Sequence, residues 1–257
     1  MHVLVVADSL AFYGPDQGEL STDPRLYPNV LAAALARQAG EPVHADVVAR
    51  TGWTARDAWW ALTRDPHVYS VLLPRASAVV LAVGNMDYMP TLLPTWLREG
   101  IRFLRPPVVR RSARSAYRAA QPLGSLVTPW RALPQRLTDR YLSNCAGGVR
   151  YYHPGVPVVG VIPPPHSAPS YGRRPRGHVR AMAAARAWGA RENVPMADLD
   201  VLVRPHLEAG RSNPDGMHFA WETHSAIGRE LARVVAAELG LSTGGGAGLA
   251  ALTSNES

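Results

Sequence analysis

The sequence has almost no cysteine and no long apolar stretch. It contains a single cysteine, Cys145, in 257 residues. One thiol excludes an intrachain disulfide and any metal site built from several cysteines. No uninterrupted apolar stretch approaches the roughly 20 residues that a transmembrane helix needs. The residues after Met1 lack the basic start and small-residue cleavage site of a secretory signal. We therefore expect a cytoplasmic protein without stable membrane insertion.

Two further kinds of site are missing from the sequence. Neither the GxGxxG pattern nor the P-loop pattern occurs, which argues against dinucleotide or nucleoside-triphosphate chemistry. The His and Asp positions show no spacing typical of a metal site. We therefore expect neither a metal nor a bound cofactor.

Lysine is absent as well, so all 27 basic residues are arginine, and the formal net charge is +7. A positive field favours anionic partners: nucleic acid, acidic lipid, or a small molecule that carries phosphate or carboxylate. Composition alone does not choose among these. The length fits one large domain or two small ones, and a hydrophobic content of 47% is ordinary for a globular protein.

Short apolar runs alternate with helical patterns along the chain. The expected strands are 2–7, 43–49, 77–83, 156–162 and 199–203, and the expected helices are 28–39, 55–64 and 178–191. A last helix is indicated by apolar residues at spacings of three and four, with Gly240 as its stop: Ile227, Leu231, Val234 and Val235. This alternation predicts an α/β fold with a parallel sheet, whose ligands bind at the carboxyl ends of the strands.

Residues 98–146 interrupt the alternation with ten arginines, several prolines and no strand pattern, so we expect a helical insertion or lid. Within it, 109–120 has helical periodicity, and its arginines fall within one quarter of a helix: Arg110, Arg111, Arg114 and Arg118. They are candidate contacts for an anionic substrate, although such a charge run is more often a solvated face. Residues 242–257, rich in Gly, Ser and Thr, predict a disordered tail after a single domain over 1–241.

The first expected strand runs into Asp8-Ser9, which makes Ser9 a candidate nucleophile. Serine needs a base to remove its proton, and the base needs a carboxylate to orient it. The turn NPDGMHF, just before the last helix, contains Asp215 and His218 three residues apart. We therefore predict a triad of Ser9, His218 and Asp215. The alternative is that Ser9 caps a turn and Asp215 is only a turn residue.

An acyl-transfer site also needs hydrogen-bond donors for the oxyanion of the tetrahedral intermediate. The candidates are the N–H groups of Ser9 and Gly52 and the side-chain amide of Asn85, each just after an expected strand. Trp53, beside Gly52, is typical of a core or pocket wall and is a further candidate substrate contact. Asp8 and Asp87 are expected to support loops by hydrogen bonding.

Four ordered blocks of this sequence resemble the SGNH (GDSL-like) hydrolase superfamily: Asp8-Ser9-Leu10, Gly52, Gly84-Asn85-Met86-Asp87 and Asp215-Gly216-Met217-His218. The chain departs from the family pattern at Ala7, where a glycine is usual, and its asparagine comes one residue early in the third block. The resemblance implies a three-layer, flavodoxin-like fold with a central parallel sheet of about five strands and helices on both faces.

A narrower resemblance is to the actinobacterial diglucosylglycerate octanoyltransferases of the SGNH group. It rests on the opening MHVLVVADSLAFYG together with GNMDYMP and NPDGMH. It implies transfer of an octanoyl group from its CoA thioester to a glucose hydroxyl of diglucosylglycerate, in mycobacterial methylglucose lipopolysaccharide assembly. The co-substrates it implies are acyl-CoA and an anionic glycoside, which suit an arginine-rich protein.

Two other functions remain open on the residues alone. Water in place of the sugar would make the same triad an esterase or thioesterase, and the catalytic residues do not separate these reactions. The arginines between 98 and 140 would also suit a nucleic-acid-binding protein, but no recognised nucleic-acid motif accompanies them. The sequence does not indicate an oligomeric state.

Overall fold

A five-stranded parallel sheet forms the centre of the computed structural model, which describes residues 1–16, 18–173 and 176–241. The strand order is β2-β1-β3-β4-β5. The strands are β1 (His2–Ala7), β2 (His44–Ala49), β3 (Ala78–Ala82), β4 (Val158–Ile162) and β5 (Met196–Asp198). The chain order therefore reverses between β1 and β3, and ligands in such sheets bind outside the carboxyl ends at this switch point.

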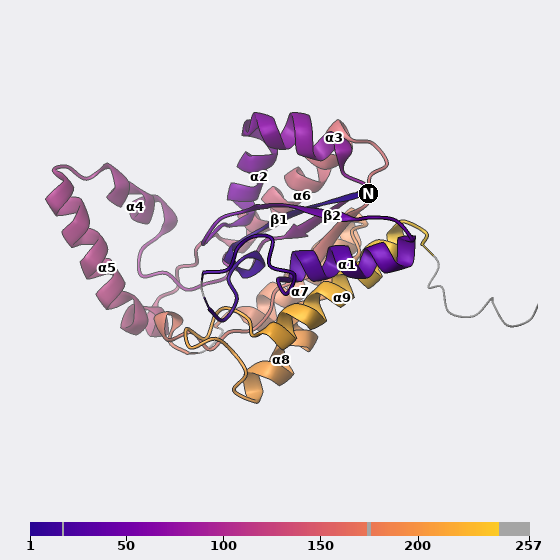
Figure 1. The fold of residues 1–257 in the computed structure, drawn as a ribbon. Helices are drawn as coiled ribbons and strands as arrows, with labels where there is room; N and C mark the ends of the chain where they lie inside the picture. Colours follow the sequence, from indigo (N-terminus) through magenta and orange to yellow (C-terminus); the bar gives the residue numbers. More distant parts are fainter. Residues whose placement is uncertain (17, 174–175, 242–257) are drawn as a thin grey trace, which may run out of the picture.

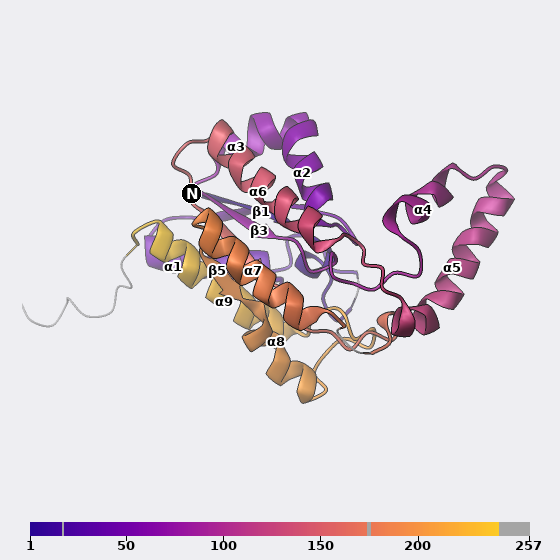
Figure 2. The same ribbon diagram turned by 180° about the vertical axis from the view of Figure 1, so that it is seen from behind.

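Helices cover both faces of the sheet, as Figures 1 and 2 show. The α-helices of the structure are α1 (Tyr27–Ala39), α2 (Ala55–Arg64), α3 (Leu73–Arg75), α4 (Thr95–Gly100), α5 (Pro107–Val127), α6 (Gln135–Tyr152), α7 (His178–Glu192), α8 (Leu199–Glu208) and α9 (Trp221–Glu238). The cores place α1, α8 and α9 on one face and α2, α6 and α7 on the other. The expected α/β fold with three layers is confirmed.

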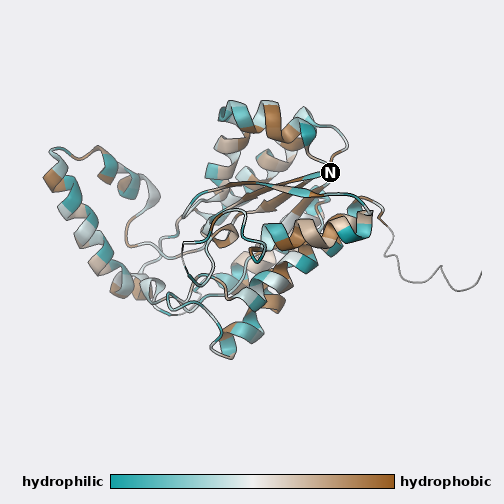
Figure 3. Ribbon diagram, viewed as in Figure 1, coloured by the Kyte–Doolittle hydropathy of each residue, from teal (hydrophilic) through white to brown (hydrophobic). Residues whose placement is uncertain are grey.

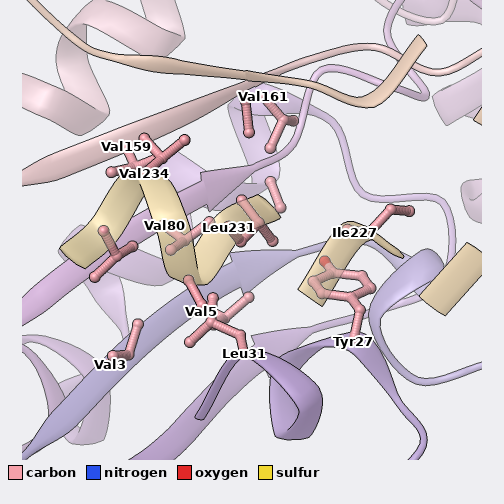
Figure 4. Packing of buried hydrophobic residues seen from close by; sticks show 14 of the residues in the cluster. Val3, Val5, Tyr27, Leu31, Val80, Val159, Val161, Ile227, Leu231 and Val234 are labelled. Atoms are coloured by element: carbon pink, nitrogen blue, oxygen red, sulfur yellow. The ribbon is translucent and has the colours of Figure 1, made fainter. Parts of the chain in front are cut away.

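Alternate residues of the strands build two separate cores. Val3 and Val5 of β1 face α1 and α9, where they lie in one cluster with Leu31 and Leu231 (Figure 4). The intervening residues, beginning with Leu4, face α2 and α6. Because both faces are buried, β1 is one continuous apolar run rather than an alternating one. In Figure 3 the strands are largely brown, the colour of hydrophobic residues.

One expected strand is wrong, because residues 199–203 begin helix α8. The side chain of Asp198 caps that helix by accepting hydrogen bonds from the N–H groups of Asp200 and Val201. Leu199 and Val203, four residues apart, are then buried on one helical face. The short strand β5 lies just before this cap.

The expected insertion over 98–146 divides into two parts with different surroundings. Residues 95–127, here called the α4–α5 arm, extend away from the sheet (Figures 1 and 2). Large apolar side chains of this arm are exposed, Trp96 and Phe103 among them. By contrast, α6 buries Leu142 and Cys145 in the core beside α2. Periodicity shows that a helix is apolar on one face, but not whether the sheet covers that face.

The last features to compare with the sequence are the C-terminal tail, membrane-spanning helices and metal sites. The tail predicted over 242–257 lies outside the described residues. Within the described ranges, no helix combines the length and apolar character that crossing a bilayer requires. In the same ranges, no three His, Cys, Asp or Glu side chains gather as a metal site would need.

Candidate active site

The end of β1 positions Ser9 through a tight local turn. Asp8 has an extended backbone, and its Oδ1 accepts the Leu10 N–H at 2.9 Å. Ser9 thereby opens a short 3₁₀ helix, and its carbonyl accepts the N–H groups of Phe12 and Tyr13. The cap of this turn is the carboxylate of Asp8. The hydroxyl of Ser9 is left for another partner.

The turn before α9 fixes an aspartate and a histidine against each other. Asp215 Oδ1 accepts the N–H groups of Met217 and His218 at 2.9 and 3.0 Å. Its other oxygen lies 2.5 Å from His218 Nδ1. Gly216, with φ of +64°, has a backbone that other residues rarely adopt, and a Cβ there would lie 2.8 Å from Ser167. The short separation of Asp215 and His218 is therefore compatible with direct contact.

The same histidine reaches Ser9, so the three predicted triad residues lie in one hydrogen-bonded chain. His218 Nε2 is 3.0 Å from Ser9 Oγ. Partial burial alone would raise the pKa of Asp215, but hydrogen bonds from the side chain and backbone of His218 outweigh it and hold the pKa below its usual value. An ionised Asp215 takes the Nδ1–H, which leaves Nε2 free to accept the Ser9 proton.

Buried contacts hold together the two loops that carry Ser9 and His218, although these loops are about 200 residues apart in the chain. The Tyr13 ring lies edge-on to His218, with centroids 4.8 Å apart. His224 Nε2–H donates to the Tyr13 carbonyl at 3.2 Å, while Nδ1 accepts the Tyr27 N–H at 3.1 Å. Burial lowers the pKa of His224 to about 4, so the ring is neutral and can accept at Nδ1. Asn213 adds a bond from Nδ2 to the Gly14 carbonyl.

The helices that follow these loops are also tightly joined. α1 begins after the Ser9 loop and α9 begins after the Asp215–His218 turn. A Cβ on Gly228 of α9 would lie 2.6 Å from Val30 of α1, so only glycine permits this approach. Sequence reasoning missed Tyr13, His224 and Gly228 as parts of the site, because their role depends on contacts between distant segments. For His224 a signal existed, since it continues the apolar stripe of α9 three residues before Ile227.

Asn85, the side-chain candidate for the oxyanion, lies against the residue that precedes Ser9. It is buried after β3, and its Nδ2 is 3.4 Å from Asp8 Oδ2. Its Oδ1 has no partner among the described residues. Burial raises the pKa of Asp8 to about 7, although the Leu10 N–H and the Asn85 amide oppose this shift. The Asn85 amide is thus held only by long contacts, to Asp8 and to the Ala82 carbonyl.

Gly52 and Asp87 belong to the neighbouring loops. Gly52 lies in the exposed turn after β2 with φ of +74°. The buried Asp87 accepts the Ala55 N–H at 3.1 Å and the Thr138 hydroxyl at 2.9 Å, and so joins the start of α2 to α6. Burial raises the pKa of Asp87 to about 7. Asp8 and Asp87 therefore support loops, as the sequence indicated.

Curated proteins resemble this chain over most of its length, although no family model matches it. The diglucosylglycerate octanoyltransferase of Mycolicibacterium hassiacum is 42% identical over 234 residues, which cover 91% of this chain and 94% of the relative. The protein of the same name from Mycobacterium tuberculosis is 40% identical, with coverage of 91% and 92%. The chain belongs to the diglucosylglycerate octanoyltransferase family.

Solved structures place this octanoyltransferase family chain in the GDSL/SGNH fold. A lipase/acylhydrolase from Enterococcus faecalis has a TM-score of 0.57 at 18% identity and covers 91% of this chain and 94% of its own. A GDSL-like lipase from Parabacteroides merdae has a TM-score of 0.59 at 11% identity, with coverage of 94% and 96%. At this identity the likeness shows the fold alone, and it confirms the expected SGNH architecture.

The expected arginine contacts lie on the α4–α5 arm of this octanoyltransferase family chain. Arg110 is half-buried and donates to the Arg102 carbonyl, whereas Arg111, Arg114 and Arg118 are exposed. Trp53 lies elsewhere, beside a cleft of about 850 Å³ along β2 and α2. The triad comes from the loops after β1 and before α9. The structure therefore brings neither the arm arginines nor Trp53 into the hydrogen-bonded chain of the triad.

Proposed function

We propose that this chain transfers an octanoyl group from its CoA thioester to a sugar hydroxyl of diglucosylglycerate, as a step of methylglucose lipopolysaccharide assembly. The observation that carries the proposal is the continuous contact from Asp215 through His218 to Ser9. Membership of the octanoyltransferase family supports the choice of acyl group and acceptor.

The first half of the reaction acylates Ser9. Its Oγ attacks the thioester carbonyl while His218 Nε2 takes the hydroxyl proton, and Asp215 stabilises the imidazolium. The N–H groups of Ser9 and Gly52 and the amide of Asn85 are the proposed donors to the oxyanion. When the tetrahedral intermediate collapses, the C–S bond breaks and the imidazolium returns its proton to the thiolate of CoA.

The second half of the reaction deacylates Ser9. His218 now removes the proton of the acceptor hydroxyl, whose oxygen attacks the octanoyl ester. Collapse of this intermediate forms the sugar ester and breaks the bond to Ser9 Oγ, which regains a proton from the imidazolium. Transfer prevails over hydrolysis only if water is kept from the ester. We propose that the α4–α5 arm acts as a lid for this purpose, and that its arginines attract anionic substrate.

Incubation with octanoyl-CoA, with and without diglucosylglycerate, tests this proposal. We expect octanoylated sugar in equal amount to the CoA released, and only slow CoA release without the acceptor. Free octanoate formed at a rate that the acceptor does not change, with no acylated sugar, would assign a hydrolase instead. Intact mass measured without acceptor should show one octanoyl group, which is located on Ser9 and missing from Ser9→Ala.

A further inference from the structure

A cleft of about 710 Å³ collects arginines at the same sheet edge as the triad. Its walls come from the loop after β3, from residues 127–135 and from the start of α7. Arg131, Arg176 and Arg180 line it, and none of the described residues in its lining is acidic. Since the loops after β1, β3 and β4 all leave the carboxyl edge of the sheet, this cleft lies at the same edge as the loop that carries Ser9.

The guanidinium of Arg131 lies beside the N-terminus of helix α7, where a positive charge is unfavourable. A Cβ on Gly177 would be 3.2 Å from its Nε and 3.3 Å from its Nη2. Gly177, with φ of +86°, is the N-cap of α7, which has no side-chain cap and no acidic residue in its first turn. The exposed N–H groups of a helix N-terminus carry partial positive charge, so a cation here is unfavourable and an anion is favourable.

The three arginines of the cleft also repel one another. Burial lowers the pKa of Arg131, and the charges of Arg176 and Arg180 lower it further. Within the described ranges, none of the three forms an ion pair. Two other arginines of α7 do form ion pairs: Arg186 with Asp198, and Arg191 with Glu192. Uncompensated charge is therefore concentrated at one end of this helix.

We propose that Arg131, Arg176 and Arg180, together with the N-terminus of α7, bind a phosphate group of the acyl donor. The inference rests on the proposed function, which takes acyl-CoA as the donor. A phosphate monoester carries up to two negative charges and offers several oxygens to guanidinium forks, whereas the carboxylate of the glyceryl acceptor carries one charge. Three arginines and a helix N-terminus match the phosphate better.

The position of the cleft fits a donor whose phosphates are far from its reactive carbon. Tyr88 lines the cleft and belongs to a small apolar cluster with Met89, Ala132 and Ala181. Met217, next to His218, packs against that cluster. This cluster therefore connects the lining of the cleft with the residue next to His218. In acyl-CoA, the pantetheine arm likewise places the phosphates at a distance from the thioester.

Binding of desulfo-CoA, which has no thiol to acylate, tests the site without catalysis. Titration calorimetry compares wild type with Arg131→Gln and Arg180→Gln, and Arg191→Gln serves as a control that removes one charge from the other end of α7. We expect Kd to rise at least about tenfold in the two cleft variants and to stay unchanged in the control. Equal affinity in all four proteins, or no binding to wild type, overturns the proposal.

Kinetics identify which substrate the arginines hold. The cleft variants should raise KM for octanoyl-CoA at least about tenfold. They should leave KM for octanoyl-N-acetylcysteamine, a thioester without phosphate, and for diglucosylglycerate as in wild type. A raised KM for diglucosylglycerate alone would assign the cleft to the carboxylate of the acceptor and overturn the proposal. Because each substitution relieves repulsion, the variants should melt no lower than wild type, which separates lost binding from lost folding.

The two proposals fail in different ways. If wild type transfers no octanoyl group but binds desulfo-CoA through Arg131 and Arg180, the proposed function is wrong and the phosphate site stands. If wild type transfers octanoyl and the cleft variants match it in Kd and KM, the phosphate site is wrong and the proposed function stands.

Discussion

We expect the reactivity of Ser9 to depend on two hydrogen bonds made by the imidazole of His218. His218 links the hydroxyl of Ser9 at 3.0 Å to the carboxylate of Asp215 at 2.5 Å. Ser9 is almost wholly buried, and its contact with His218 is partly buried. Each member is therefore useful only while the other two are in place.

Removing either Ser9 or His218 should abolish transfer without unfolding the chain. We expect Ser9→Ala and His218→Ala to lower kcat by about three to six orders of magnitude, because both remove the proton-transfer path. Their melting temperatures should stay within a few degrees of wild type, since neither side chain fills a core. Initial rates and thermal circular dichroism measure both quantities. Activity near that of wild type in either variant would contradict the assigned roles.

His224 should make part of the stability of the protein depend on pH. Its pKa is about 4 in the folded chain, below the usual 6.5, so the unfolded chain binds the proton more readily. The stability supplied by neutral His224 is therefore complete above about pH 6.5 and falls as the pH drops towards 4. Full loss corresponds to on the order of 3 kcal/mol.

Comparison with His224→Asn isolates this effect, since Asn can accept and donate but does not titrate in this range. Urea unfolding at pH 7, 6, 5 and 4 should show the advantage of wild type shrinking as the pH falls. Asp8 and Asp87, whose raised pKa values act in the opposite direction, are present in both proteins and cancel in the difference. A difference that stays constant with pH would show that His224 does not supply it.

At the scale of elements, the α4–α5 arm exposes large apolar side chains, and none of its apolar residues belongs to the buried core. Trp96 is 73% exposed and lines a cavity of about 550 Å³ between the arm and α6. Trp130 and Leu137 are further apolar walls of this cavity, and its charged walls are Arg56, Glu99 and Arg131. Exposed apolar surface of this kind marks a contact that forms with a ligand or partner.

We expect Trp96→Ser to shift the reaction from transfer towards hydrolysis while leaving stability unchanged. If the arm excludes water, a smaller polar side chain should admit it to the acyl-enzyme and raise the ratio of free octanoate to acylated sugar by several-fold. Tyr151→Ser is the matched control, because Tyr151 is 80% exposed at the far end of α6. Equal product ratios in wild type and both variants would contradict a water-excluding arm.

At the scale of the whole molecule, the charge of +7 creates a positive field that acts on every anionic substrate. Salt screens such a field, since the Debye length falls from about 10 Å at 0.1 M to about 3 Å at 1 M. We expect KM for octanoyl-CoA to rise several-fold between 0.05 and 0.5 M NaCl with little change in kcat. The phosphate-free octanoyl-N-acetylcysteamine is the control. An equal rise for both donors would indicate a general salt effect.

The parallel sheet, and the sheet edge at which the triad residues lie, followed from the sequence. Apolar runs such as residues 2–7 form strands because both faces of a parallel sheet are buried. The Asp215–His218 turn followed from local chemistry as well, since Asn-Pro-Asp-Gly favours a turn and the two side chains are close in the chain. The helix at 199–203 was missed because an aspartate cap outweighed a short apolar run.

Only the tertiary structure decided which distant groups meet. Ser9 and His218 are 209 residues apart, and their contact depends on a close pairing of α1 and α9 that periodicity does not encode. The arginines show the same division. Their number follows from composition, but the convergence of Arg131 and Arg180 at one helix end depends on how the loops after β3 and β4 fold back. Local patterns determine elements, whereas long-range packing determines the distances on which catalysis and binding depend.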